Sequence, residues 1–394
     1  MKMDIVIIGG GLAGLALALA LRRTALNIAL IEGRAPQVDS GEADWDARIY
    51  AISPINTRFL DQLGIWSQLD PTRLCPVKGM DVQGDAGGRL AFSAYDSGVS
   101  ELACIVESSA MQRQLWQAAQ NQDNLTLLCP AQPQALALEE RQARLTLVDG
   151  RELQASLIVA ADGADSWTRN AAGIDVKFKP YEQMGVVANF VAHCTHRGHR
   201  QIARQWFGRH GILAWLPLPE NRISMVWSTP SDHARELLSL AASQPTEFCR
   251  RVAAAGDFCM GDLTLLTAPQ AFPLRLMRAP HSVKPRLALI GDAAHTIHPL
   301  SGHGVNLGFQ DAQTLAKVLS DNPIYADCGN FLRLRMYERA RKAEVVALQT
   351  MTDGLYRLFQ PSAAPLSFLR NLGLNFTDRA PVLKDALVRY ALAS

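Results

Sequence analysis

The sequence predicts an α/β protein, with a Rossmann-like nucleotide-binding domain, an inserted antiparallel β-sheet domain and a C-terminal helical region. Three observations lead to this fold class. Glycine-containing turns join short apolar strands to helices near residue 9 and again near residue 291. Between residues 176 and 267 successive strand-like runs replace the strand–helix alternation. From residue 331 onward the apolar residues recur at helical spacing.

Length and composition fit a folded protein with a large core. The 394 residues are 48% hydrophobic and 19% charged, which excludes a disordered chain. No apolar run approaches the roughly 18 residues of a membrane span. A net charge of +2 gives no general attraction to nucleic acid. The seven cysteines are odd in number and lack a CxxC pair, so we expect free thiols, no zinc site and a cytoplasmic location.

The N-terminal stretch carries a dinucleotide-binding pattern. An apolar run at residues 4–8 leads into a G-x-G-x-x-G motif and then into the helical stretch 15–21. Gly9 permits the tight turn, Gly11 lets the backbone approach a pyrophosphate, and Gly14 lets the helix pack close to the sheet.

The surroundings of the motif strengthen this interpretation. The backbone N–H groups around Leu12 and Ala13 open a helix and would face the phosphates. A second strand-like run at residues 27–31 ends in Glu32, near the spacing of a carboxylate that binds a ribose hydroxyl. The motif predicts a bound dinucleotide but does not distinguish nicotinamide from flavin.

Two later strands end in an aspartate. The buried run 287–290 is followed by Gly291 and Asp292, a loop with two histidines, and a helix from about Val305. The run 157–161 is followed in the same way by Asp162 and Gly163. Such an aspartate can accept hydrogen bonds from ligand hydroxyls, but an ordinary strand–helix connection has the same composition. The pattern alone leaves both interpretations open.

The remaining elements follow from periodicity and turn signals. Arg48 lies in a segment before a helix, where it either reaches the cofactor or caps a surface helix. The patterns predict helices at 54–63, 107–119 and 232–242, hairpins at 77–92 and 145–153, and strands at 186–191, 202–207, 212–216 and 223–227.

Three histidines, at positions 193, 196 and 199, recur in a polar loop. A metal site needs ligands that converge, and the neighbouring arginines would repel a cation. We therefore expect no metal.

The C-terminal part reads as a long helix over residues 331–358, interrupted at Gly354, followed by helices at 366–374 and 382–392. Five basic residues lie on its early turns. A basic helix of this kind contacts a membrane surface in some proteins, but a solvated face is the usual explanation.

Taken together, three motifs resemble the group A flavoprotein monooxygenases of the para-hydroxybenzoate hydroxylase fold. They are residues 9–14 with Glu32, residues 161–166, and residues 291–295 with Pro299. Within that superfamily the chain is most similar to the ubiquinone-biosynthesis hydroxylases. This similarity rests on residues 48–53, 304–308, 337–339, 352–355, 372–374 and 378–381.

The resemblance implies FAD as the bound cofactor, NAD(P)H as a transient reductant and O2 as co-substrate. The residues that it places against the cofactor are Gly9, Gly11, Leu12, Ala13, Gly14, Glu32, Arg48, Gln112, Asp162, Gly163, Asp292, Pro299, Gly302, His303, Gly304, Val305 and Asn306. The same resemblance divides the chain into FAD-binding parts at 1–78, 101–175 and 276–330, substrate-domain strands at 79–100, a β-sheet substrate domain at 176–275 and C-terminal helices at 331–394.

One position departs from the family pattern. Relatives commonly have Gly-Gln-Gly where this chain has Gly302-His303-Gly304, near the expected flavin pyrimidine. Either only the backbone of His303 matters, or its protonatable ring alters flavin redox behaviour.

The implied reaction is hydroxylation of an aromatic ring through a flavin C4a-hydroperoxide. In the ubiquinone subfamily the substrate is a hydrophobic, polyprenylated phenol or quinol. Partners would then include other quinone-biosynthesis proteins, or the inner face of the membrane by peripheral contact. Residues that either line an apolar pocket or form plain core are Trp206, Phe207, Trp215, Met225 and Trp227.

No protein base can be assigned from these patterns; His295 and His298 are candidates only because they lie close to the third motif. Rival functions share the FAD motifs. They are a hydroxylase of a soluble phenolic compound, a flavin-dependent reductase of prenyl chains, and a non-catalytic FAD-binding subunit of a biosynthetic assembly.

Overall fold

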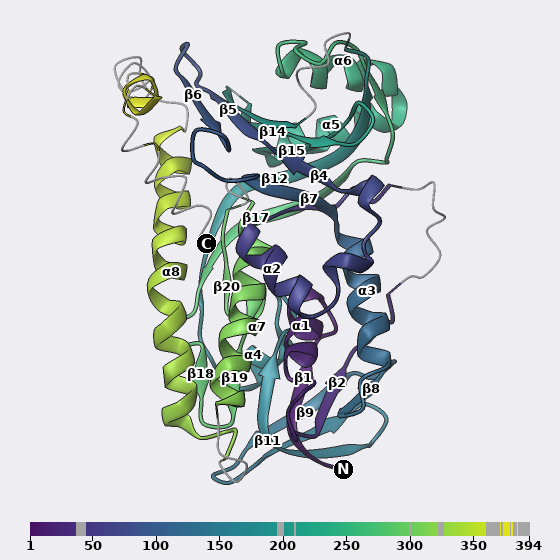
Figure 1. Ribbon diagram of the computed structural model, residues 1–394, viewed down its shortest axis with the longest axis vertical. Helices are drawn as coiled ribbons and strands as arrows, with labels where there is room; N and C mark the ends of the chain where they lie inside the picture. Colours follow the sequence, from purple (N-terminus) through teal and green to yellow (C-terminus); the bar gives the residue numbers. More distant parts are fainter. Residues whose placement is uncertain are drawn as a thin grey trace.

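The computed structural model describes residues 1–36, 45–194, 201–208, 210–298, 302–321 and 327–359, together with residues 371, 373–378, 380 and 384. Two large sheets form the molecule, and they are joined by a small sheet of three strands (Figure 1).

The first sheet is the nucleotide-binding one. Its parallel centre consists of β19, β11, β1, β2 and β8, with β18 antiparallel at one edge and β10 and β9 extending β11. The bounds are β1 Lys2–Ile8, β2 Ile28–Ile31, β8 Leu125–Leu128, β9 Pro133–Leu138, β10 Ala143–Leu147, β11 Glu152–Ala160, β18 Val283–Lys284 and β19 Leu287–Leu289.

Three helices lie together on one face of this sheet: α1 Leu12–Ala20, α3 Ser108–Gln120 and α7 Gly304–Ser320 (Figure 1). The central strands are almost entirely apolar because both faces are buried, the pattern expected of a parallel sheet. The short helices α2 Pro54–Gln62 and α4 Trp167–Ala171 complete this part.

The second sheet has the order β20-β17-β12-β15-β14-β13-β5-β6, with β16 paired to β12. All of its pairs are antiparallel except that of β13 with β5. The bounds are β5 Gly79–Gln83, β6 Arg89–Ser93, β12 Lys177–Ala192, β13 Ile202–Gly208, β14 Gly211–Leu218, β15 Arg222–Pro230, β16 Leu263–Leu265, β17 Gln270–Arg278 and β20 His295–Thr296. Two helices, α5 Ser231–Ser243 and α6 Pro245–Ala255, cover one face of it.

The small sheet consists of β3 Ile49–Ile52, β4 Cys75–Val77 and β7 Ala103–Glu107. The long helix α8 Phe331–Leu358 runs beside α7 (Figure 1). It continues through Gly354, so the interruption predicted there is wrong. The helices expected at 366–374 and 382–392 fall largely outside the described residues.

The predicted strand–turn–helix units at both glycine motifs, both hairpins and the antiparallel sheet are confirmed. Sequence patterns missed α6 and the two-residue strand β20. Strand β20 pairs with β17 and so places part of the 291–302 loop at the edge of the second sheet. The division of the chain into domains stays a proposal. Strand β17 of the second sheet extends to Arg278. We therefore propose that the boundary between the β-sheet substrate domain and the following FAD-binding part, placed at residue 276 from the sequence, lies a few residues later.

A buried ionic network joins α7 to its surroundings. Asp311 on α7 is fully buried, and its Oδ2 accepts hydrogen bonds from Gly291 N at 2.9 Å and from His295 Nε2 at 2.7 Å. Its Oδ1 accepts from Arg341 Nε on α8 at 2.7 Å. Burial by itself would raise the pKa of Asp311, but His295 and Arg341 outweigh it and hold that pKa below its usual value. One carboxylate therefore fixes α7, α8 and the turn after β19 together.

We expect Asp311→Asn to lower the free energy of unfolding by about 3–5 kcal/mol, because it removes the buried one of the two carboxylates that compensate Arg341, the other being the partly exposed Glu344. Urea titration followed by circular dichroism measures this loss. Asp149→Asn, which removes an exposed carboxylate paired with Arg151, is the control and should change stability little. Equal effects of the two substitutions would contradict the role assigned to Asp311.

Candidate functional site

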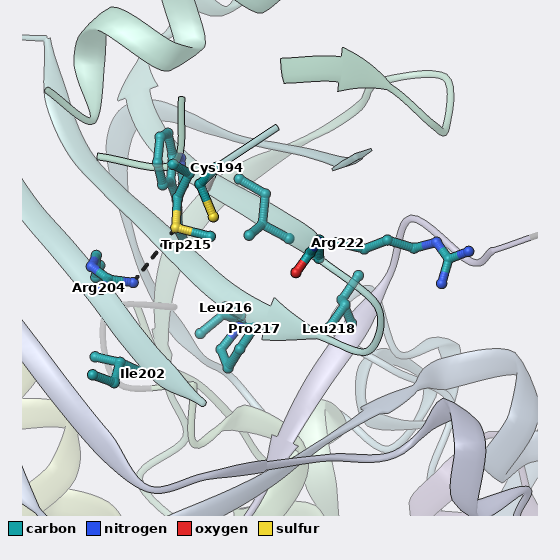
Figure 2. A pocket seen from close by; sticks show the side chains of 11 residues that line it. Cys194, Ile202, Arg204, Trp215, Leu216, Pro217, Leu218 and Arg222 are labelled. Atoms are coloured by element: carbon teal, nitrogen blue, oxygen red, sulfur yellow. Dashed lines mark hydrogen bonds between the residues drawn. The ribbon is translucent and has the colours of Figure 1, made fainter. Parts of the chain in front are cut away.

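A cavity of about 910 Å³ lies where the first sheet, the small sheet and the second sheet meet. Its walls come from the glycine loop, β3, the turn after β19, the start of α7, and strands of the second sheet. A separate hollow of about 10 Å³ lies inside the second sheet beside Trp215 and Arg204 (Figure 2). That hollow has room for about one water molecule, so the large cavity is the candidate site.

The glycine loop is shaped for close approach. Gly9 has φ +109°, and a Cβ there would lie 2.4 Å from Ala161 O. A Cβ on Gly14 would lie 2.1 Å from Gly9 O, whereas a Cβ on Gly11 would meet no atom within 4 Å. Two of the glycines are thus required by internal packing, and Gly11 leaves open space at the wall of the cavity.

Two helices begin at the cavity. Helix α1 has Gly11 as its N-cap and α7 has His303, and neither cap residue makes a side-chain hydrogen bond to its helix. The first residues of both helices line the cavity, Leu12 and Ala13 on α1 and Gly304 on α7. Unsatisfied N–H groups and the positive ends of two helix dipoles therefore face the same space, which favours phosphate or carbonyl oxygens there.

Asp292 lies in the turn after β19, and its side chain is exposed to the cavity although protein surrounds the cavity itself. Burial raises the pKa of this carboxyl group, while the positive charges of His295, Arg48 and Arg275 oppose that rise. Arg48 and Arg275 also line the cavity. A carboxylate held between cations at the wall of a cavity is well placed to accept hydrogen bonds from ligand hydroxyls.

Buried Arg169 ties the two aspartate-containing strand ends to each other. Its Nη1 donates to Ala293 O and its Nη2 to Ala164 O, both at 3.0 Å. Because Ala293 follows Asp292 and Ala164 follows Gly163, the arginine sets the separation of the two turns at the cavity wall.

Asn306 holds the start of α7 against the small sheet. Its Oδ1 accepts from Ser53 N and Asn56 Nδ2, each at 3.0 Å, and its Nδ2 donates to Ala51 O at 2.8 Å. On the opposite wall, Gln112 Nε2 donates to Gly10 O at 3.3 Å. These amides position backbone at the cavity wall.

The cavity brings together most of the residues predicted from sequence: Gly11, Leu12, Ala13, Arg48, Gln112, Gly163, Asp292, Gly302, His303, Gly304, Val305 and Asn306. Pro299 lies outside the described residues. Gly9, Gly14, Glu32 and Asp162 are close by in the fold but are not part of the cavity lining.

Two of the predicted carboxylates make hydrogen bonds to the protein itself. Glu32 Oε2, after β2, accepts from Gly10 N of the glycine loop at 2.6 Å. Asp162 accepts from the hydroxyl of Ser166 and from the N–H and hydroxyl of Thr168, so it shapes the start of α4. Direct contact of Glu32 and Asp162 with a cofactor stays a prediction.

The second sheet supplies a mostly apolar wall. Strand register places Val187, Val226, Ala214 and Gln205 side by side, and the next row contains Leu216, Ala203, Met80 and Phe92. Residues opposite one another in a sheet share a face, and all of these line the cavity.

The pocket interpretation of Trp206, Phe207, Trp215, Met225 and Trp227 is wrong. Four of them alternate with the wall residues and pack in the core beneath α5 and α6. Phe207 lies on the cavity face but belongs to an apolar cluster with Val82 and Leu90 beyond the cavity. The sequence shows the alternation of the strands but not which face meets the cavity.

His295 and His298 do not line the cavity. His295 is bound to Asp311. His298 is fully buried, its ring 4.9 Å from that of Tyr181 and 5.2 Å from that of Tyr356, and burial lowers its pKa to about 4. Their closeness in sequence to the third motif therefore does not place either imidazole as a base for a molecule in the cavity.

The polar cavity residues that were not selected from sequence include Tyr50, Arg275 and Gln205. Tyr50 lies in β3 of the small sheet, two residues after Arg48. The other two come from strands whose cavity face only the register reveals.

The described histidine of the loop at 193–199 is His193, whose Nε2 lies 2.9 Å from Thr264 Oγ1; His196 and His199 fall outside the described residues. Within the described ranges, no group of three or more His, Cys, Asp or Glu side chains is placed to hold a metal ion.

Comparison with known proteins decides the family. The family model described as FAD binding domain matches residues 2–350. The chain belongs to this family. It is also 34% identical over 390 residues to the 3-demethoxyubiquinol 3-hydroxylase of Escherichia coli (strain K12), covering 99% of this chain and 98% of that protein.

A second relative is the ubiquinone hydroxylase UbiL of Rhodospirillum rubrum, 33% identical over 395 residues, covering 99% of this chain and 90% of that protein. The structure of P. aeruginosa PqsL in complex with 2-aminobenzoylacetate superposes with a TM-score of 0.77 at 22% identity, covering 95% of this chain and 100% of that one. This likeness shows a shared fold.

FAD is therefore the cofactor of this FAD-binding protein, and the geometry fits it. The open wall at Gly11, the uncapped start of α1 and the carboxylate of Asp292 follow one another along a single cavity. An adenine dinucleotide needs the same order of groups, with backbone N–H for its pyrophosphate and an acceptor for its sugar-alcohol hydroxyls.

We expect Asp292→Ala to weaken FAD binding by about tenfold to one hundredfold, because charge-assisted hydrogen bonds to the cofactor are lost. The measurement is FAD fluorescence during titration of apoprotein. Asp165→Ala removes another cavity-lining carboxylate, one that is largely exposed and paired with Arg275, and should leave FAD affinity nearly unchanged. Full FAD affinity in the Asp292 variant would overturn this assignment.

Proposed function

We propose that this protein is an FAD-dependent, NAD(P)H-consuming monooxygenase that hydroxylates the aromatic ring of a polyprenylated phenol or quinol in ubiquinone biosynthesis. The observation that carries the proposal is the continuity of the cavity. The groups suited to FAD and the apolar wall of the second sheet line one continuous cavity. The similarity to relatives that are named as ubiquinone hydroxylases supports the substrate class.

We propose that FAD is held along one side of this cavity by the predicted cofactor residues. The glycine loop from Gly9 to Gly14 and the start of α1 bind its pyrophosphate, and Asp292 binds its ribityl chain. Residues 302–306 lie against the ring system, with Arg48 and Gln112 on the opposite side. Glu32 contacts the adenosine ribose after giving up its hydrogen bond to Gly10.

The chemistry that bound FAD supplies is two-electron reduction by NAD(P)H followed by activation of O2. Overall, one oxygen atom replaces a ring hydrogen to give the hydroxyl group and the other leaves as water. NAD(P)H and one proton provide the reducing equivalents. The chain itself positions the ring and excludes water from it.

The wall of the second sheet suits that task. Val187, Val226, Ala214 and Leu216 present side chains that neither donate nor accept hydrogen bonds. Such a wall favours an apolar aromatic ring and keeps water away from reactive species. The cavity is partly open to solvent, and the polyprenyl chain of the substrate extends out of it through that opening.

Quinone profiling of cells that lack this protein tests the proposed function. We expect ubiquinone to fall and a less hydroxylated prenylated intermediate to accumulate, and its structure identifies the ring carbon. Purified protein should oxidise NAD(P)H faster when that intermediate is added. An unchanged quinone profile would overturn the substrate assignment, while FAD binding would stand.

We further propose that the protein is cytoplasmic and contacts the inner face of the membrane peripherally, through α8. No helix in the described part of the chain is long and apolar enough to cross a membrane. On one face of α8, however, Leu332, Met336 and Val346 are 76%, 60% and 49% exposed. Arg339 and Lys342 are also exposed on this helix. Apolar side chains flanked by cations suit an anionic lipid surface, where the prenyl chain of the substrate resides.

Flotation with vesicles containing phosphatidylglycerol tests this contact. The double substitution Leu332→Glu with Met336→Glu should lower the bound fraction at least tenfold, because two apolar side chains no longer insert and two negative charges oppose binding. Val148→Glu places one negative charge at an exposed valine in the turn between β10 and β11, outside α8, and serves as the control. Equal binding of all three proteins would point to a solvated face or a protein partner at α8.

A further inference from the structure

Gln205 is the polar exception in the apolar wall of the cavity. It lies on β13, is 5% exposed, and lines the cavity. No hydrogen bond to its side-chain amide is formed by the residues that the structure describes. The amide is not one of the fully buried side-chain groups that lack a partner, so its polar atoms are open to the cavity, where a bound molecule can satisfy them.

The neighbours of Gln205 on the sheet explain why the protein does not satisfy the amide. Register places Val82 of β5 on one side and Ala214 of β14 on the other. Two residues away along the same strand, Ala203 and Phe207 share its face. All four positions are apolar, so the amide can find its partner only in the cavity.

Other polar residues of the second sheet that line the cavity have side-chain partners in the protein. Thr296 Oγ1 donates to Arg275 O at 3.1 Å, and Arg275 Nη2 donates to Asp165 Oδ1. Arg204 precedes Gln205 on β13 and its Nη1 contacts Met260 Sδ at 3.8 Å on the opposite face (Figure 2). Among the described residues, Gln205 is therefore the polar residue that the second sheet presents to the cavity without a protein partner for its amide.

We infer that the amide of Gln205 binds an oxygen substituent on the aromatic ring of the substrate and thereby selects oxygenated rings. This inference rests on the proposed function and adds a specificity-determining residue to it. The amide can donate from Nε2 to a ring oxygen and accept a phenolic proton at Oε1. A ring without oxygen displaces the water that hydrates the amide and leaves the amide unsatisfied.

The expected consequence is a preference for oxygenated rings, because a ring without oxygen leaves the amide unsatisfied and therefore binds more weakly. A site that contains a buried hydrogen-bonding group discriminates strongly against analogues that lack the matching group. For one neutral amide we expect a preference of about tenfold to one hundredfold.

The test uses 2-propylphenol and propylbenzene, which differ by one ring oxygen, and the FAD-loaded protein. Binding is measured from the change in the visible absorption of the flavin, so no turnover is needed. The wild-type protein should bind the phenol more tightly than the hydrocarbon. Gln205→Leu, which has similar size and no polar atom, should lose that preference by binding propylbenzene more tightly and the phenol more weakly.

The matched control is Gln83→Leu. Gln83 lies on the adjacent strand β5, but it pairs with Trp206 and therefore lies on the opposite face of the sheet. The same chemical change there should leave both affinities unaltered. Gln205→Met provides a second apolar variant in case Gln205→Leu does not retain FAD.

The outcomes separate the inference from the proposed function. If the preference for the phenol persists in both Gln205 variants, the role of Gln205 is refuted although the proposed function stands. If the wild-type protein binds neither phenol nor hydrocarbon while it retains FAD, the aromatic substrate class itself fails. Loss of the preference in the Gln205 variants but not in Gln83→Leu supports the inference.

Discussion

The carboxylate of Asp311 is the interaction on which the arrangement of this protein depends. It is fully buried, and three donors from three separate places satisfy it: Gly291 N, His295 Nε2 and Arg341 Nε. Through these bonds the turn that presents Asp292 is fixed to α7 and α8. A single charge of this kind is stabilising only while every partner is present, so the network tolerates little movement. The cofactor side of the cavity is therefore held in place, because the turn that carries Asp292 is bonded to Asp311.

The substrate side is built differently, from the two faces of one sheet. Large aromatic residues such as Trp215 and Trp227 fill the face beneath α5 and α6. Smaller residues such as Ala203 and Ala214 occupy the other face and leave room for the cavity. The alternation of a strand thus separates the residues that stabilise the sheet from those that meet a ligand. Among the strand residues on the cavity face, Gln205 is polar, and we infer from its position which substituent the substrate carries.

The acidic residues of the three motifs also make different kinds of contact. Asp292 reaches the cavity, whereas Glu32 bonds to the backbone of the glycine loop and Asp162 to groups at the start of α4. An aspartate at the end of a buried strand can serve either purpose, and the motif is the same in both cases. Arg169 adds a further constraint, because it bridges the carbonyl groups of Ala164 and Ala293 and so sets one strand end against the other.

By itself, the sequence determined the fold class, the dinucleotide pattern, the strand ends at Asp162 and Asp292, and several of the elements between them, but not α6, β16 or β17. These features depend on local spacing and on the conformational freedom of glycine, which the order of residues records directly. Only the tertiary structure showed that His295 hydrogen-bonds to Asp311 and that His298 is buried beside two tyrosines. It also showed that Gln205 rather than Trp206 faces the cavity. Those outcomes depend on strand register and on contacts between residues far apart in the chain, and a shift of one residue would reverse which side chain meets the ligand.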